Sequence, residues 1–169
     1  DIHVSDVSIK WPNDIYWHDK KIAGILIENV LSGSTFSRAI IGMGLNINQK
    51  NFYSDAPNPV SLYQITGRTY KIEKILDEFT EAFGKRYTDT FTNSSDRIHK
   101  EYIAALYRND GAYPFYSDGN IFHASIADVE LDGHLLLSTE SGEATHRTDP
   151  KAWKVVPKDI YCYEPVQQS

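Results

Sequence analysis

The segment that decides the fold, Lys10–Glu28, reads KWPNDIYWHDKKIAGILIE. Pro12 fixes its own φ angle and has no amide donor, so a first strand is expected to end near Trp11. Asn13 and Asp14 suit the backbone of a turn and can also point polar side chains at a ligand. A short charged turn and an apolar run follow. The segment therefore predicts a strand, a tight loop and a second strand, with ionisable groups gathered at the loop.

The apolar run after the charged turn is expected to form a strand from Ile22 to Leu31. Alternate side chains of a strand point to opposite faces, so Lys21 and its neighbour Lys20 are expected to point in opposite directions. A glycine within a strand is costly unless a ligand or another chain segment approaches the backbone closely. From spacing alone, the segment is a β-hairpin with a decorated turn. Strict alternation gives it two faces: Ala23, Ile25 and Ile27 on one, and Gly24, Leu26 and Glu28 on the other.

The next strand is expected from about Phe36 to Asn48 and contains the sequence IIGMGLNIN. One of its faces is apolar and is expected to pack against the protein. The opposite face is bare backbone with two amides, on which a flat ligand can lie and form hydrogen bonds. The glycine pattern is not a dinucleotide-binding fingerprint, because the third glycine and the following helix are lacking. The apolar set is Met43, Leu45 and Ile47, and the bare set is Gly42, Gly44, Asn46 and Asn48.

Two helices are expected after a loop at Asn51–Pro59. The first, Ile72–Tyr87, has apolar residues at helical spacing that are expected to form a core face. The second is expected at Ser95–Tyr107, capped by Ser94 or Ser95 and ended by the Asn109-Asp110-Gly111 turn. The apolar positions of the first helix are Ile72, Ile75, Leu76, Phe79, Phe83 and Tyr87, and those of the second are Ile98, Tyr102, Ile103 and Leu106.

The last third of the chain has short strands separated by turn pairs. Asp132-Gly133 is a strong hairpin turn between strands expected at Ile121–Leu131 and His134–Thr139. Another turn is expected at Ser141-Gly142-Glu143, and further short strands at Trp153–Val156 and Cys162–Tyr163. This pattern predicts a small all-β barrel of the SH3 type.

The composition of the 169 residues narrows the function. The net charge of −6 argues against a nucleic-acid-binding surface, which needs a basic patch. The chain has no run of 18 apolar residues that would predict a membrane span, and no signal-peptide pattern. The single cysteine, Cys162, favours a reducing, cytoplasmic location. No P-loop or nucleophile elbow occurs. The six histidines show no metal-ligand spacing and are expected at the surface: His3, His18, His99, His123, His134 and His146.

Two motifs together resemble the signature of biotin–protein ligases. The first is the Lys-Trp-Pro-Asn-Asp block with its charged turn and its small-Gly-hydrophobic strand ending in glutamate. The second is the Gly-x-Gly-hydrophobic-Asn strand, and Pro59-Val60-Ser61-Leu62 also fits the family pattern. The matching positions are Lys10, Trp11, Pro12, Asn13, Asp14, Lys21, Ala23, Gly24, Glu28, Gly42, Gly44 and Asn46.

The resemblance implies a two-step, ATP-dependent reaction in which biotin is activated as biotinyl-5′-AMP and then transferred to a lysine of a carrier protein. Lys21 is then the catalytic residue, contacting the biotin carboxylate and the adenylate phosphate. Removing such a preorganised donor typically costs roughly 10²–10³ in rate. Lys10 is a second phosphate candidate or a solvated lysine at a strand end. The implied biotin and adenylate contacts are Lys10, Asn13, Asp14, Lys21, Ala23, Gly24, Ile25, Gly42, Gly44 and Asn46.

Four residues have two interpretations each, or a role that depends on the ligand. Asp14 suits a magnesium ion or a lysine partner, but it also suits a turn cap. Asn13 and Asn46 have amides that can bind adenine or ribose edges. Glu28 fits an edge charge or a dimer interface as well as the family motif.

The resemblance also implies the architecture. The expected fold class is α/β: a mixed sheet with packed helices of the class II aminoacyl-tRNA synthetase and biotin ligase type, incomplete at its N-terminus, followed by an SH3-like barrel. The expected domains are 1–111, the C-terminal portion of the catalytic domain, and 112–169. The family's Gly-Arg-rich loop does not occur in the sequence. The chain is therefore expected to be the C-terminal portion of such a ligase, whether cut from a longer protein, completed by another chain or a defective relative. Alone it is expected to be weak or inactive and without a repressor role.

The implied partner is a biotin carboxyl carrier protein or a subunit of a biotin-dependent carboxylase. A homodimer through an exposed sheet edge is also expected, since such an edge presents unpaired backbone. Two alternatives stay open: a relative of lipoate–protein ligases, and a non-catalytic interaction fragment.

Overall fold

The computed structural model describes residues 4–32, 35–53, 58–92, 95–117, 120–139, 146–148 and 161–162. Within them the chain forms two compact units, Asp1–Tyr107 and Arg108–Ser169. The expectations for Ser94, the turn at 141–143, the strand at 153–156 and Tyr163 lie outside the described residues. In the described part of the chain, no helix has the length and apolar content needed to cross a membrane.

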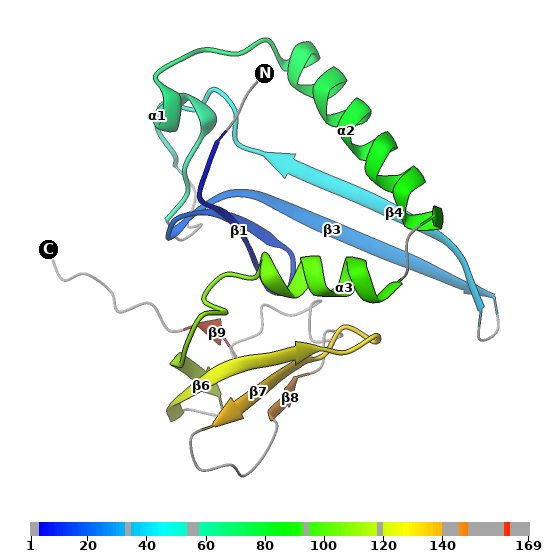
Figure 1. Cartoon of the computed structure of the whole chain (residues 1–169). Coiled ribbons are helices and arrows are strands. Elements are labelled where there is room, and N and C mark those ends of the chain that lie inside the picture. Colours follow the sequence, from blue (N-terminus) through cyan, green and yellow to red (C-terminus); the bar gives the residue numbers. More distant parts are fainter. Residues whose placement is uncertain are drawn as a thin grey trace, which may run out of the picture. The chain divides into compact units, whose positions relative to one another are not determined.

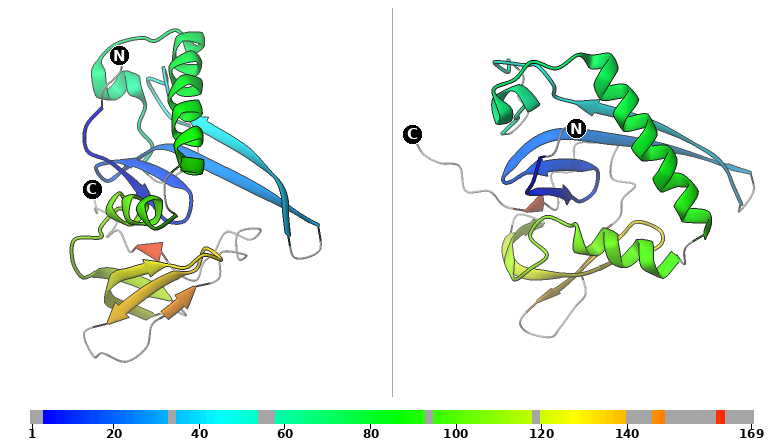
Figure 2. Two further views of the ribbon diagram at one scale, coloured as in Figure 1. Left: turned by 45° about the vertical axis from the view of Figure 1, so that its right-hand side comes forward. Right: turned by 45° about the horizontal axis from the view of Figure 1, so that its top comes forward.

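The first unit contains a four-stranded antiparallel sheet of order β1-β2-β3-β4 (Figure 1). Its strands are β1 (Val7–Lys10), β2 (Asp14–Trp17), β3 (Lys20–Ser32) and β4 (Thr35–Leu45). β1 ends at the residue before Trp11, as the proline predicts. β3 and β4 are much longer than the other two strands, so their far ends form a two-stranded arm that projects beyond β1 and β2 (Figure 2).

The expectation of a mixed sheet needs correction. The pairings between the named strands are antiparallel, and the parallel pairs in the described residues are two isolated bridges, Ile9 with Leu106 and Lys21 with Pro59. Both bridges join the sheet to a segment from later in the chain. In the described residues of this unit, parallel pairing is thus limited to these two isolated bridges.

The core of the first unit lies beneath the start of β3. Ile22, Ala23, Val60 and Leu62 are buried there, and half-buried apolar residues from β2, the end of β4 and the following loop pack around them. Helix α1 (Leu62–Thr66) begins at Ser61, whose hydroxyl accepts a hydrogen bond from the Gln64 amide in a capping box. The segment after the loop is thereby fixed against β3.

Helix α2 spans Ile72–Thr92 and α3 spans Ser95–Ala104. The helical spacing predicted both helices, but the expected burial of the first one is wrong. Apolar side chains of α2 are 40–74% exposed, although neighbouring rings stack along the helix. The spacing of apolar residues predicts that the segment is helical, but burial of its apolar face needs another surface packed against it. Among the described residues, Ile75 is the position of α2 that packs against the buried core. The exposed set is Ile72, Leu76, Phe79, Phe83, Tyr87 and Phe91.

The second unit contains the antiparallel sheet β8-β7-β6-β5-β9 (Figure 1). The strands are β5 (Tyr113–Ser117), β6 (Asn120–Val129), β7 (Leu135–Thr139), β8 (His146–Thr148) and β9 (Tyr161–Cys162). The hairpin turn falls at Asp132-Gly133, as predicted, and Gly133 has a φ of 90°. The order of the described strands places β8 and β9 at opposite edges, so the sheet is not closed into a barrel within those residues.

Candidate active site

The centre of the candidate site is an ion pair between Lys21 on β3 and Asp14 on β2. The Lys21 ammonium lies 2.5 Å from a carboxylate oxygen of Asp14, and the two side chains are 32% and 24% exposed. An ion pair of this exposure is partly screened by water and adds little to stability. It does, however, hold an ammonium group in a fixed place at the edge of solvent.

A β-bulge brings the ammonium to this face of the sheet. Asp14 pairs with Gly24 and Ile15 with Ala23, but Tyr16 pairs with Lys21, so Ile22 is an extra residue in β3. Strict alternation places Lys21 and Gly24 on opposite faces. The extra residue reverses that relation, because a bulge shifts the pattern by one position and re-aims the side chains beyond it. Lys21 therefore lies over the same face as Gly24 and Asp14.

Gly24 forms part of a bare floor beside the ion pair. A Cβ atom at Gly24 would lie 3.3 Å from Asp14 Oδ1 and 3.5 Å from Lys21 Nζ, which shows that both side chains stand over this residue. Gly44 is directly opposite Gly24 on β4, and Gly42 is two positions away on the same face. A Cβ at Gly44 would meet nothing within 4 Å. The open backbone next to the ion pair is thus the place where a flat ligand could lie.

The remaining predicted residues contribute in different ways. The backbone carbonyl of Asn13 accepts a hydrogen bond from the Ile25 amide at 2.8 Å. The Asn46 amide nitrogen donates to the Ile22 carbonyl at 2.9 Å, and its side-chain amide reaches the Lys21 carbonyl at 3.4 Å. Ala23 is buried in the core, so its side chain is turned away from the floor. A ligand on the floor can contact Ala23 through its main chain alone.

Lys10 pairs with Asp14 across β1 and β2, and its ammonium is held by an aromatic ring rather than freely solvated. Its ammonium donates to the Tyr16 hydroxyl at 3.0 Å and lies 4.6 Å from the centre of the same ring. The Tyr107 ring packs on Tyr16 at 5.2 Å, and the Tyr107 hydroxyl donates to Asp19. The contacts of Tyr107 with Tyr16 and Asp19 were not predicted from the sequence, because these residues lie far apart along the chain; Tyr107 and Asp19 are 88 residues apart.

Lys20 and Glu28 lie outside the cluster. Lys20 is exposed at the turn and pairs with Trp17 across the strands. Glu28 is exposed on the arm opposite Ile40. Lys21 is therefore the lysine of the charged turn that faces the glycines.

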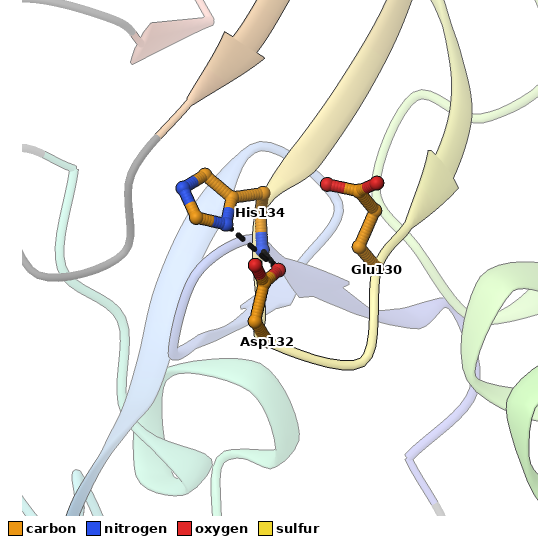
Figure 3. A group of neighbouring side chains, drawn as sticks. All are labelled: Glu130, Asp132 and His134. Atoms are coloured by element: carbon orange, nitrogen blue, oxygen red, sulfur yellow. Dashed lines mark hydrogen bonds and ion pairs between the residues drawn. The ribbon is translucent and has the colours of Figure 1, made fainter.

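A second group of ionisable side chains lies on the hairpin of the other unit (Figure 3). Glu130, Asp132 and His134 each offer a ligand atom, and these atoms lie within 4.8 Å of one another. The histidine spacing did not predict this group, and His134 is mostly buried rather than at the surface. Its Nδ1 lies 2.7 Å from Asp132 Oδ1, and the backbone amide of His134 donates to that oxygen at 3.3 Å. These contacts account for the grouping as a hairpin turn, so we assign no metal site to it.

Comparison with known proteins identifies the family. Residues 1–46 match the family model of the biotin/lipoate A/B protein ligases, and this range holds every predicted contact residue. The bifunctional ligase/repressor BirA of Bacillus subtilis is 31% identical over 140 residues, covering 79% of this chain and 42% of the relative. The biotin–[acetyl-CoA-carboxylase] ligase of Paracoccus denitrificans is 30% identical over 140 residues, covering 80% of this chain and 58% of the relative. The chain belongs to the biotin–protein ligase family.

The chain spans about half the length of these relatives. The fold agrees with that of the ligase family: the biotin protein ligase of Aquifex aeolicus, solved in complex with biotin and ATP, superposes with a TM-score of 0.62. That match has 21% sequence identity and covers 84% of this chain and 61% of the other. The α/β architecture with antiparallel sheets is thus the ligase architecture.

Proposed function

We propose that this chain carries the phosphate-facing part of the site of an ATP-dependent biotin–protein ligase. The observation that carries the proposal is the Asp14–Lys21 pair standing over the bare floor at Gly24 and Gly44. Adenylation joins a carboxylate to a polyanion, so it needs a fixed cation where negative charge gathers. Lys21 supplies that cation, and the glycines let the ligand approach the main chain.

In the first step, a biotin carboxylate oxygen attacks the α-phosphorus of ATP, and pyrophosphate leaves. In the second step, the amine of a carrier lysine attacks the acyl carbon, AMP leaves, and an amide forms. Lys21 stabilises the carboxylate and the phosphate in both steps. Asp14 holds the Lys21 ammonium in place before the ligand arrives. We assign the side-chain amides of Asn13 and Asn46 to the adenine or ribose edges.

Magnesium fits this site in a limited way. Asp14 offers one carboxylate that is already paired with Lys21, and Mg²⁺ typically binds proteins through one or two carboxylates plus substrate phosphates. The site therefore suits an ion that arrives with ATP and shields its phosphate charge. Lys10 is a less direct contact, because its ammonium is held by Tyr16.

The wider assignments follow the same proposal. We assign residues 1–111 to the catalytic domain and 112–169 to an SH3-like C-terminal domain, with a biotin carboxyl carrier protein or carboxylase subunit as the acceptor. A cytoplasmic location agrees with the single cysteine. We also propose a homodimer through the sheet edge. The arm carries apolar side chains that are more than half exposed: Leu26, Ile27, Ile40 and Ile41.

Calorimetry tests the proposal, with biotin, ATP and a non-hydrolysable biotinyl-adenylate as separate ligands. Lys21→Ala is expected to remove the adenylate affinity, whereas Lys20→Ala, which removes the same charge one residue away, is expected to retain it. Equal losses in both variants would show a general charge effect and would contradict the assignment of Lys21. Stronger competition by lipoate than by biotin would favour the lipoate ligase alternative.

A further inference from the structure

The main chain of Lys21 is held from its outer side by a segment that lies 37 residues further along the chain. The Lys21 amide donates to the Asn58 carbonyl at 2.9 Å, and the Val60 amide donates to the Lys21 carbonyl at 2.9 Å. Together they form the isolated parallel bridge between Lys21 and Pro59. A bulge disrupts the regular ladder around its residues. Here the segment Asn58–Val60 supplies the hydrogen-bond partners at the edge of the bulge.

The two ends of this segment are fixed in different ways. Val60 and the two residues after it are buried, and the hydroxyl of Ser61 donates to the Gln49 carbonyl at 2.6 Å. Asn58 is exposed, and its φ of 47° lies in the left-handed region. Asparagine tolerates this region better than other residues with a side chain, and β-branched residues tolerate it poorly. The direction of the Asn58 carbonyl therefore depends on a backbone conformation that its own side chain permits.

We propose that Asn58 is a positioning residue for Lys21: its left-handed backbone aims a carbonyl at the Lys21 amide and so places the ammonium over the glycine floor. The inference rests on the proposed function insofar as Lys21 binds the adenylate. The positioning itself is a property of the free protein. It can therefore be measured without any ligand.

The test is NMR of the side-chain ammonium groups in protein labelled with ¹⁵N-lysine. The signal that disappears in Lys21→Arg is assigned to Lys21. Asp14→Asn shows where that signal lies when the ion pair is absent. Asn58→Val is expected to move the Lys21 signal towards that of Asp14→Asn. Asn58→Val is also expected to weaken biotinyl-adenylate binding about tenfold or more, because the displaced Lys21 ammonium would lose its hydrogen bond to the charged ligand. Asn58→Gly adopts the same φ without strain and is expected to restore both values.

Asp6 provides a matched control within the same unit. It also has a left-handed φ, of 60°, and its carbonyl accepts the His18 amide at 3.1 Å. Asp6→Val thus introduces the same kind of strain at a carbonyl that does not hold Lys21. It is expected to lower stability as Asn58→Val does, but to leave the Lys21 signal and adenylate affinity unchanged.

The outcomes separate the two ideas. An unchanged Lys21 signal in Asn58→Val, or equal shifts in Asp6→Val, would overturn the positioning role. A shifted signal with unchanged adenylate affinity would support positioning and count against Lys21 as a ligand contact. If Asn58→Val does not fold, Asn58→Ala imposes a smaller strain and is judged by the same signal.

Discussion

Replacing single glycines of the floor separates a structural role from a ligand-binding one. An alanine Cβ at Gly24 would lie 3.3 Å from Asp14 Oδ1 and 3.4 Å from Lys21 Cε. The contact with Asp14 Oδ1 is tighter than an ordinary one, so that carboxylate must move by a few tenths of an ångström, whereas the distance to Lys21 Cε is close to ordinary van der Waals contact. The neighbours are the ends of partly exposed side chains. Gly24→Ala is therefore expected to cost about 1 kcal/mol, the low end of the overpacking range.

Gly44→Ala is expected to behave differently, because its Cβ would meet nothing within 4 Å. Alanine has fewer backbone conformations than glycine in the unfolded chain, so less conformational entropy is lost on folding. The free energy of unfolding is therefore expected to stay the same or to rise by about 0.4–1 kcal/mol. The same methyl group would occupy the floor, so binding of the biotinyl-adenylate analogue is expected to fall at least tenfold. Gly84→Ala in α2 is the matched control, since it stabilises a helix and leaves the floor untouched.

Urea unfolding followed by tryptophan fluorescence gives the stability, and calorimetry gives the affinity. The decisive variant is Gly44→Ala. Its free energy of unfolding should be at least that of the parent protein, whereas its affinity for the ligand should fall because the added methyl group blocks the floor. Full affinity in Gly44→Ala would show that the ligand does not lie on this face of the sheet. The assignment of the floor would then be wrong, whatever Lys21 contributes.

Further predictions concern stability away from the floor. Ser61→Ala is expected to cost about 1–2 kcal/mol in urea unfolding, because the buried hydroxyl caps α1 and also binds Gln49; a cost below a few tenths would contradict the capping role. Hydrogen bonds from Arg97 and then Arg86 hold the pKa of Glu101 below its usual range. A carboxyl group whose pKa is lowered in the folded state stabilises the fold above its unfolded pKa, and this contribution is lost as the pH falls through its folded pKa. The free energy of unfolding should therefore decline at acid pH, and Arg97→Gln should weaken that decline. An ordinary pKa for Glu101 in an NMR titration would refute this. Phe83→Ser on the exposed face of α2 is expected to change unfolding by less than 1 kcal/mol while reducing binding of an apolar dye; a cost of 3 kcal/mol or more would show that the face is buried.

Local signals in the sequence were enough to locate the strands and turns of the candidate site. Pro12 ends the first strand, and Asp132-Gly133 forms the second unit's hairpin, because each restricts the backbone within a few residues. The bare face expected at Gly42 and Gly44 agrees with the open space beside Gly44 in β4. These predictions depend on short-range conformational preferences, which the sequence contains directly.

The features that the sequence did not reveal depend on pairing between distant residues. Alternation placed Lys21 away from Gly24, and only the register between β2 and β3 shows that Ile22 is an extra residue. The contact of Lys10 with Tyr16 depends on a similar cross-strand arrangement. Burial of the α2 stripe failed for a related reason: helical spacing identifies an apolar face but does not say what opposes it.

The position of the bulge explains why the candidate site lies where it does along β3. Ile22 and Ala23 are 4% and 5% exposed, whereas Leu26 and Ile27, only a few residues further on, are 53% and 52% exposed. The ion pair stands at this transition. Its backbone is anchored by the buried core and by the segment Asn58–Val60, while the glycine floor extends along the open arm. A cation held by a rigid base beside an open surface can receive an anionic ligand without reorganising.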